Sequence, residues 1–184
     1  AYRRPVTEQE MGPLLAFYNQ GFDMGGFEEG VRRALTRALA SPNFLYRIQT
    51  TPENLAPGEV YEIDDLELAT RLSFFLWSSI PDRELLDLAI AGKLSDPAVM
   101  NQQVDRMIED PRSFTLSSNF AYQWLGLSKL DEINPDGGVY PYAFGAGDLR
   151  PDFKQELELF IDAIIRNDHS VVDLLDAKFS FLNE

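Results

Sequence analysis

Cysteine is absent from this 184-residue sequence, and histidine occurs once, at His169. The lack of cysteine excludes disulfides, thiolate metal sites, a cysteine nucleophile and haem attached through a Cys-x-x-Cys-His motif. One imidazole is too few for the usual zinc ligand sets, or for a di-iron bundle that needs Glu-x-x-His on two helices. We therefore expect this chain to bind no metal or cofactor, and we assign it no catalytic, cofactor-binding or metal-ligating residue.

Basic residues are scarce, 16 against 30 acidic ones, which gives a net charge of −14. The first 50 residues hold six basic and five acidic residues, so the remainder, with ten basic and 25 acidic residues, carries −15. Such a surface repels phosphate groups, whose binding depends on Lys and Arg, so we expect neither nucleic acid nor anionic lipid as a partner. The acidity either solvates helix faces or attracts cationic partners.

Long hydrophobic runs and strand patterns are also missing. The longest uncharged apolar run, residues 72–81, is much shorter than the roughly 20 residues that span a bilayer, so no membrane span is expected. No window shows sustained alternation of apolar and polar residues, which a half-buried strand requires. These absences predict an all-α fold.

The helix signals divide the chain at a linker. Thr7-x-x-Glu10 is a capping box that begins a first helix, which is predicted to end near residues 19–21. A second helix is predicted after a glycine-rich turn at residues 21–26 and ends at Ser41-Pro42. Their apolar stripes are Met11, Leu14, Leu15 and Tyr18, then Phe27, Val31, Ala34, Leu35, Ala38 and Leu39. Residues 50–59 contain two prolines and a glycine, so we predict a small two-helix domain over 1–50 and a larger helical domain over 60–184.

Four further helix starts and a last short turn are predicted in the larger domain. They are Asp64-x-x-Glu67, Ser79-x-x-Asp82, Asp96-Pro97, Asp110-Pro111 and Ser170-x-x-Asp173. The first of these helices is apolar nearly all round, which indicates a central position, and Trp77 and Trp124 are interpreted as core residues. An irregular segment at residues 128–150 precedes a helix that carries Phe153 to Ile165. The prediction is an irregular multi-helix bundle in two contiguous parts.

Two groups of residues resemble parts of catalytic sites. Asp168 and His169 are adjacent, but neighbours in sequence point apart and no Gly-x-Ser-x-Gly elbow exists, so His169 is either catalytic or a helix-terminal surface residue. Glu158 and Asp162 lie four residues apart on one helical face, and a glycosidase requires two carboxyl groups that flank its bond. Spacing alone does not choose between such a pair and two solvated carboxylates.

Three loop motifs suggest binding sites. Glu132-x-Asn134-x-Asp136-Gly137 resembles the start of a calcium loop, but position twelve is Ala143 in place of a bidentate Glu, so a turn is the alternative. Gly145-x-Gly147 lacks a third glycine and a preceding strand, so it is interpreted as a bend. The aromatic segment at residues 139–144 either packs on the bundle or binds a sugar ring, a peptide or another subunit.

The sequence resembles two bacterial domains of unknown function in tandem. The first resemblance rests on Tyr2-Arg3-Arg4-Pro5, Phe27-Glu28-Glu29-Gly30 and Ser41-Pro42-x-Phe44-Leu45-Tyr46-Arg47. The second rests on Leu68-Ala69-x-Arg71-Leu72-Ser73-x-Phe75-Leu76-Trp77, Asp110-Pro111-Arg112, Phe120-x-x-Gln123-Trp124-Leu125, Ser170-Val171-x-Asp173-Leu174-Leu175 and Phe181-Leu182-Asn183-Glu184. The resemblance implies a large exported protein of the planctomycete type, located in the periplasm, cell envelope or outside the cell, often with a c-type haem domain elsewhere in the protein. It implies no activity.

We therefore expect a structural and interaction module of a larger exported protein, with no chemistry of its own. Its expected partners are the remainder of the parent polypeptide or other protein subunits. The alternative is a hydrolytic, for example carbohydrate-active, enzyme that uses paired carboxylates. Phe179, Phe181 and Leu182 lie at the end of the sequence, so the fold is expected to be completed by polypeptide that continues beyond Glu184.

Overall fold

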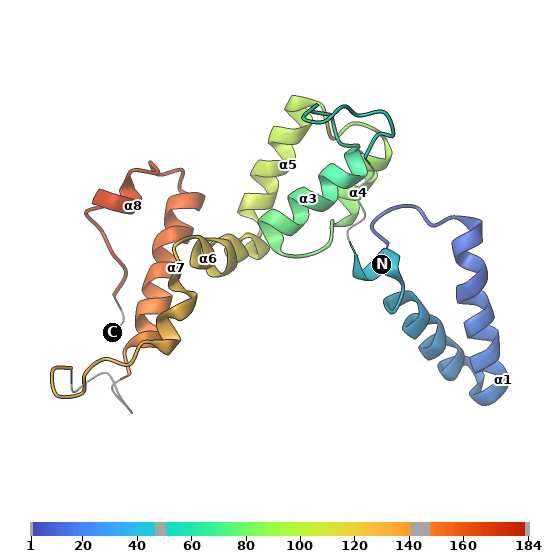
Figure 1. Cartoon of the computed structure of the whole chain (residues 1–184), viewed down its shortest axis with the longest axis horizontal. Coiled ribbons are helices and arrows are strands. Elements are labelled where there is room, and N and C mark those ends of the chain that lie inside the picture. Colours follow the sequence, from blue (N-terminus) through green and yellow to red (C-terminus); the bar gives the residue numbers. More distant parts are fainter. Residues whose placement is uncertain (1, 47–50, 141–147, 183–184) are drawn as a thin grey trace. The chain divides into compact units, whose positions relative to one another are not determined.

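The computed structural model describes residues 2–46, 51–140 and 148–182, apart from the side chain of Ser128, and these ranges contain helices and no strand (Figure 1). The predicted all-α fold is confirmed. The α-helices are α1 (Glu8–Leu39), α2 (Pro42–Leu45), α3 (Asp65–Trp77), α4 (Arg83–Ile90), α5 (Pro97–Glu109), α6 (Tyr122–Trp124), α7 (Arg150–Arg166) and α8 (Asp173–Asp176). No helix among the described residues is both long and apolar enough to cross a membrane.

The chain forms two compact units. One comprises Ala1–Arg71 with Pro81–Asp96, and the other comprises Leu72–Ile80 with Pro97–Glu184. The division falls inside α3, so this helix contributes its first half to one unit and its second half to the other. The domains predicted from composition, 1–50 and 60–184, are continuous stretches of sequence. That division stays a prediction.

In the first unit, α1 is a helical hairpin (Figure 1). The predicted capping box begins it: the Thr7 hydroxyl accepts a hydrogen bond from the Glu10 backbone N–H at 3.3 Å, and the Thr7 N–H donates to the Glu10 carboxylate at 3.0 Å. The helical backbone breaks at Gly25 and Gly26, where Gly26 adopts a φ of 77° that favours glycine. The predicted end near residues 19–21 is therefore wrong, because the first arm continues past Gly21.

Gly21 serves close packing between the two arms of this hairpin. A Cβ atom at Gly21 would lie 2.6 Å from the backbone oxygen of Glu29, and a Cβ atom at Gly30 would lie 2.9 Å from the ring of Tyr18. Gly21 and Gly30 are also the buried residues of α1. The predicted glycine-rich turn is thus also a packing site, because its first glycine allows two helical backbones to approach each other.

We expect Gly21→Ala to lower the free energy of unfolding of the hairpin by about 1 to 3 kcal/mol, since the new methyl group meets backbone that has no room to move. Gly12→Ala is the matched control in the same arm, because its added Cβ meets no atom within 4 Å beyond its chain neighbours and its own helix backbone, and it should change the free energy of unfolding by less than about 1 kcal/mol. Thermal unfolding followed by circular dichroism measures both changes. Equal effects of the two substitutions would contradict the close-packing role of Gly21.

In the rest of the first unit, two carboxylates at the start of α3 accept backbone hydrogen bonds. Asp64 caps α3 as predicted, with its carboxylate 2.7 Å from the Glu67 N–H. The next carboxylate, Asp65, accepts hydrogen bonds from the N–H groups of Leu94 and Ser95 at 2.7 and 3.2 Å, which fixes the segment after α4. Helix α4 begins at Arg83 with Asp82 as its cap, so the predicted start at Ser79 is three residues too early.

The second unit contains α5, α6, α7 and α8 with three irregular helical segments. Pro97 begins α5 as predicted, but Asp110-Pro111 begins a 3-10 turn, Pro111–Phe114, followed by a π-helical segment, Leu116–Ala121. A further 3-10 segment, Leu127–Glu132, overlaps the start of the stretch predicted to be irregular, so that stretch is helical as far as Glu132. The core of this unit consists of Leu76, Trp77, Met107, Leu116, Ile161 and Ile164.

Candidate interaction site

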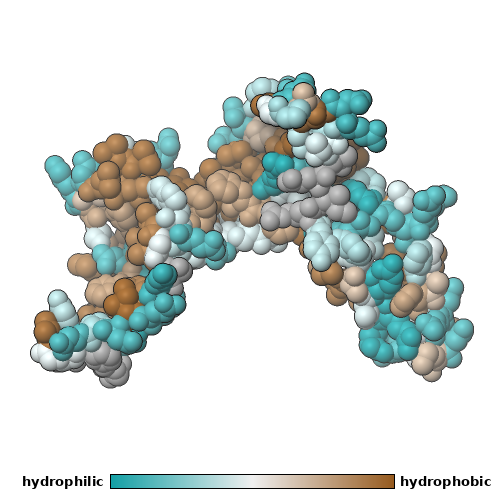
Figure 2. Space-filling view, in the orientation of Figure 1, coloured by the Kyte–Doolittle hydropathy of each residue, from teal (hydrophilic) through white to brown (hydrophobic). Residues whose placement is uncertain are grey.

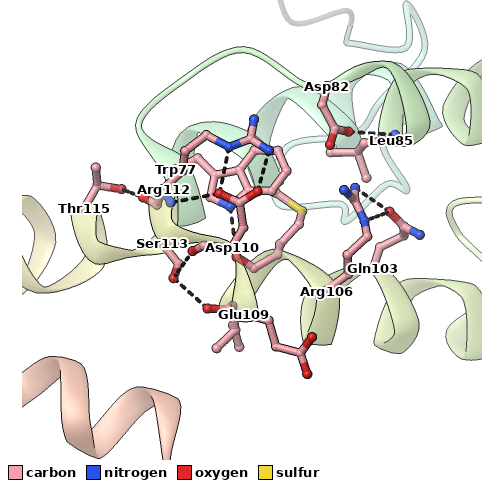
Figure 3. A network of polar contacts seen from close by, with 12 residues as sticks. Trp77, Asp82, Leu85, Gln103, Arg106, Glu109, Asp110, Arg112, Ser113 and Thr115 are labelled. Atoms are coloured by element: carbon pink, nitrogen blue, oxygen red, sulfur yellow. Dashed lines mark hydrogen bonds and ion pairs between the residues drawn. The ribbon is translucent and has the colours of Figure 1, made fainter.

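Trp77, at the end of α3, is the anchor of the second unit (Figure 3). Its side chain is 2% exposed, and its indole N–H donates a hydrogen bond to the Met107 carbonyl oxygen at 2.9 Å. The guanidinium carbon of Arg112 lies 3.5 Å from the indole ring centroid, a distance typical of a cation–π contact. Trp77 therefore joins α3, α5 and the segment that follows α5, and its predicted core position is confirmed.

Asp110 holds Arg112 in place over this indole ring. The carboxylate accepts hydrogen bonds from the Arg112 Nε and Nη2 atoms at 2.9 and 2.7 Å, and from the Arg112 backbone N–H at 2.8 Å. These bonds to the Arg112 side chain and backbone lower the pKa of Asp110 from 3.8 to about 2. The predicted Asp-Pro start is thus a cap that also orients a cation toward Trp77.

We expect the stability of the protein to depend on acid through Asp110. A carboxyl whose folded-state pKa is lowered stabilises the fold above its unfolded pKa, near 3.8, and this stabilisation disappears as the pH falls toward about 2. Asp110→Asn keeps a capping oxygen but removes the charge, so its stability should fall less steeply than that of the wild type between these pH values. Unfolding by urea at several pH values measures the difference. Parallel curves for the two proteins would contradict the role of the carboxylate.

Two hydroxyl groups attach the same segment to its neighbours. The Ser113 hydroxyl donates to the Ile108 carbonyl oxygen at 2.7 Å, and the Thr115 hydroxyl donates to the Leu76 carbonyl oxygen at 3.1 Å. The second bond links the segment directly to the last turn of α3. The path of the chain from Asp110 to the π-helical segment is therefore fixed by side chains along its length.

Arg166, in the last turn of α7, binds the end of α5 from the other side. Its Nη1 atom donates to the carbonyl oxygens of Ile108 and Glu109 at 2.9 and 3.3 Å, and its Nη2 atom donates to that of Asp110 at 3.4 Å. Asp162, one turn earlier in α7, accepts from Arg166 Nε at 2.9 Å. These carbonyl groups lie at a helix C-terminus, where the helix dipole favours a cation.

An exposed row of three aromatic rings lies on this framework, and we call Phe75, Phe120 and Trp124 the aromatic ladder. The rings of Phe75 and Phe120 are 5.5 Å apart with an angle of 72° between their planes, and those of Phe120 and Trp124 are 6.2 Å apart with an angle of 9° between their planes. Their exposed fractions are 53%, 48% and 61%. The predicted core position of Trp124 is therefore wrong. Figure 2 shows apolar surface over α6 in this part of the chain.

The π-helical segment Leu116–Ala121 carries the middle ring of the ladder. Such segments are rare and occur often at functional sites. Near its two ends, Ser117 and Tyr122 bury hydroxyl oxygens that have no hydrogen-bond partner among the described residues, and burial raises the pKa of Tyr122. Each buried unpaired hydroxyl costs about 1 to 3 kcal/mol, which the packing of this segment against α7 must offset.

The two stretches of sequence that carry the ladder contain no charged residue. Residues 72–81 and 113–128 contain no Asp, Glu, Lys or Arg, although a quarter of the whole sequence is charged. The polar groups available there are hydroxyls and amides, and Asn119 Nδ2 donates to the Ser78 hydroxyl at 3.1 Å. An apolar, uncharged surface of this kind is suited to a neutral apolar ligand or partner.

His169 is paired with Asp173 in the structure and not with its neighbour Asp168. Asp168 adopts a φ of 51° at the end of α7, while the His169 Nδ1 atom lies 3.6 Å from a carboxylate oxygen of Asp173. The imidazole ring also lies 5.3 Å from the ring of Phe179. These contacts place His169 in the link between α7 and α8, in agreement with its interpretation as a helix-terminal residue.

In the carboxylate pair Glu158 and Asp162, Asp162 accepts hydrogen bonds from Arg166 Nε at 2.9 and 3.0 Å. A glycosidase also needs one carboxyl group with a raised pKa to act as its acid. Glu10 and Glu29 show the opposite effect: hydrogen bonds from Arg4 and from Arg32 lower their pKa values to about 2. Glu10 and Glu29 are therefore structural ion-pair partners of arginines.

The predicted calcium-like loop forms a turn in its described part. The Asp136 carboxylate accepts a hydrogen bond from the Gly138 N–H at 2.8 Å, as in an Asx turn. No group of three or more His, Asp or Glu side chains that could hold a metal ion occurs among the described residues. Ala143 and Gly145-x-Gly147 lie outside these residues, and so does most of the aromatic segment, of which Val139 and Tyr140 are 64% and 60% exposed.

The C-terminal aromatic residues are partly packed on their own unit. The Phe179 ring lies 5.4 Å from that of Phe160 in α7 and 6.3 Å from that of Phe181. Leu182 is 90% exposed and Leu175, in α8, is 91% exposed. Figure 2 shows hydrophobic surface over α8 and the adjoining end of α7. Phe179 thus packs against α7 and Phe181 packs against Phe179, whereas Leu182 is exposed.

Fold and site together define an all-α protein module whose candidate site is an exposed aromatic surface on a polar framework. Comparison with protein families then identifies it further: residues 63–184 match a family described as protein of unknown function (DUF1592), PSD4, and the chain belongs to this family. Residues 1–49 match protein of unknown function (DUF1595), PSD5. The two matches in tandem agree with the resemblance found in the sequence. No curated protein and no solved structure matches the chain.

Proposed function

We propose that this chain is a structural and interaction module of a larger multidomain protein, and that the aromatic ladder is a surface on which other polypeptide docks. The observation that carries the proposal is the exposure of Phe75, Phe120 and Trp124 at 53%, 48% and 61% on a framework fixed by hydrogen bonds. Aromatic side chains are enriched in the centres of protein interfaces, where they contribute most of the binding energy.

Rigidity of the framework supports this role. Phe75 lies two residues before Trp77, whose indole is buried and hydrogen-bonded. Phe120 follows the segment that is held by the Thr115 bond to Leu76 and by the Asp110 cap. A surface held in its binding shape loses little conformational entropy when a partner binds. The ladder therefore resembles a preformed interface more closely than a flexible loop.

The partner that fits this surface is uncharged and apolar at its centre. The sequence that forms the ladder carries no formal charge, so a strongly basic or acidic partner finds no complementary group there. We propose the remainder of the parent polypeptide, or another subunit of its assembly, as this partner. The tandem family matches support a module that functions alongside other domains.

The resemblance also supports the proposal that the parent protein is exported and stands near a c-type haem domain. This chain would then position the haem-bearing part without itself carrying a c-type haem, whose covalent attachment requires cysteine. Fractionation of the native organism, with detection by an antibody against this chain, tests the location. Recovery of the parent protein in the cytoplasm alone would contradict it.

The docking role is tested by reconstitution in two pieces. The 184-residue chain is mixed with the adjoining segments of its native gene product, expressed separately, and binding is measured by calorimetry. Phe120→Ser with Trp124→Ser should weaken binding by at least about tenfold, because each buried aromatic ring contributes more than 1 kcal/mol. Val171→Ser with Leu175→Ser is the control, since these side chains are 69% and 91% exposed elsewhere in the same unit. Equal affinity of both variants would refute the ladder as the interface.

A further inference from the structure

The turn that begins at Asp136 carries a chemical feature that the aromatic ladder does not involve. Asp136 is followed by two glycines, and it is the only aspartate in the sequence with glycine directly after it. Asp136, Gly137 and Gly138 are all exposed. The backbone nitrogen that follows an aspartate can attack the carboxyl group of that aspartate. A following glycine hinders this attack least, because it has no Cβ atom.

The backbone around Asp136 is held by three hydrogen bonds. The Val139 and Tyr140 N–H groups both donate to the Asp136 carbonyl oxygen, at 3.0 and 2.7 Å. The Gly138 N–H donates to Asp136 Oδ1 at 2.8 Å, which closes the Asx turn. The Gly137 N–H donates no hydrogen bond to any residue in the described part of the chain. The nitrogen that would attack is therefore not engaged in the turn.

The bond from Gly138 brings the reacting groups into one small ring. This ring runs from Asp136 Oδ1 through Cγ and the main chain to the Gly138 nitrogen, and it includes the Gly137 nitrogen. The bond restricts the Asp136 side chain to conformations that fold back along the following peptide. The Gly138 N–H also points at the oxygen on which negative charge develops when Cγ is attacked, as in an oxyanion hole. The turn thus favours attack on its own carboxyl group.

We propose that Asp136 is a self-modification site, at which the turn promotes the isomerisation of aspartate to isoaspartate. The Gly137 nitrogen bonds to Cγ of the protonated carboxyl group, whose hydroxyl group leaves as water with the proton of the Gly137 N–H. The product is a cyclic succinimide. Water then adds to the Asp136 backbone carbonyl carbon and breaks its bond to the Gly137 nitrogen, which takes up a proton. One water molecule leaves and one returns, so no other reactant is needed.

The isomerisation changes the turn that precedes the exposed Tyr140. The main chain then runs through Cβ and Cγ of Asp136, so it is one carbon atom longer, and the former backbone carbonyl becomes a free carboxylate. The Val139 and Tyr140 N–H groups can no longer close the same turn on that oxygen. Tyr140 is 60% exposed and belongs to the aromatic segment predicted at residues 139–144. The modification therefore alters how the chain presents the start of this segment.

The first test follows isoaspartate in the folded 184-residue chain during incubation for several weeks at neutral pH. Trypsin releases Asp136 in a peptide of residues 130–154, which also contains Asp131, Asp148 and Asp152 as internal controls. Electron-transfer fragmentation in the mass spectrometer distinguishes isoaspartate from aspartate at each position. We expect isoaspartate to form at Asp136 at least about tenfold faster than at the three controls. Equal rates at the four positions would overturn the proposal.

Two comparisons separate the role of the turn from that of the Asp-Gly pair alone. A synthetic peptide of residues 130–140 contains the pair without the fold around it. Gly138→Pro removes the N–H that binds the carboxylate in the folded chain, and the same substitution in the peptide is the matched control. We expect the folded wild-type chain to isomerise at least as fast as the peptide. The substitution should slow the folded chain by at least about threefold and leave the peptide rate nearly unchanged.

Two results of these comparisons would overturn the proposal. A rate in the folded wild-type chain well below that of the peptide would show that the turn protects Asp136. A Gly138→Pro chain that isomerises at the wild-type rate would show that the bond to the carboxylate does not promote the reaction. Circular dichroism verifies that the variant chain keeps its helices.

Discussion

Replacement of Trp77 by alanine is expected to lower the free energy of unfolding by about 3 to 5 kcal/mol, the largest effect of any single substitution considered for this protein. The indole is 2% exposed, so its removal leaves a cavity in the second unit. It also leaves the Met107 carbonyl oxygen without its indole donor, and it removes the ring on which the Arg112 guanidinium rests. Each of these losses acts in the same direction.

Trp124→Ala is the matched control for this experiment. The side chain of Trp124 is 61% exposed and contacts Phe120 at a ring distance of 6.2 Å, so its removal should cost less than about 1 kcal/mol. Chemical denaturation of the two variants measures both values. A loss below roughly 1 kcal/mol for Trp77→Ala would mean that Trp77 does not anchor α3 in the second unit.

Arg166→Met should have the second largest effect, a loss of about 2 to 3 kcal/mol. The substitution keeps an apolar side chain but removes the donors that bind the carbonyl oxygens of Ile108 and Glu109, and it leaves the Asp162 carboxylate without its cation. Hydrogen bonds from a charged group at a helix C-terminus are among the stronger ones in proteins.

The control for Arg166 is Arg83→Met. The Arg83 side chain is 93% exposed and lies 3.5 Å from the Asp87 carboxylate within one helix, an arrangement worth only a few tenths of a kcal/mol. Urea unfolding at neutral pH compares the two variants. Losses of equal size would contradict the conclusion that α7 is attached to the end of α5 through Arg166.

Local signals in the sequence predicted the starts of helices well. The caps at Thr7, Asp64 and Asp110 and the proline at position 97 are found in the structure, because a cap depends on residues within one turn. The start at Ser79 was wrong for the same local reason: Ser79 and Asp82 both satisfy the cap pattern, and only the structure selects Asp82.

Apolar periodicity predicted which residues share a helix face but not what covers that face. The α1 stripes are real, yet Leu15 and Leu35 are exposed, and Trp124 was assigned to a core that it does not enter. Spacing in sequence carries no information about the partner of a stripe. Gly21 was interpreted as a turn residue because close approach of two backbones is a tertiary property.

The candidate site was not predicted as a set, although one signal was present. Phe120 and Trp124 are four residues apart in an uncharged stretch, which places both rings on one side of a helical segment. Phe75 joins them from α3, and Arg166 binds carbonyl groups 56 to 58 residues away, so these contacts depend on the tertiary fold.

Hydroxyl-radical footprinting read by mass spectrometry tests most directly whether the aromatic ladder is an interface within a larger protein. The oxidation rates of the two tryptophans are compared between this chain alone and the longer native gene product. We expect Trp124 to be oxidised rapidly in the chain alone and several times more slowly in the longer protein, with Trp77, 2% exposed, slow in both. An oxidation rate of Trp124 that is equally high in both proteins would contradict the proposal that other polypeptide covers the ladder.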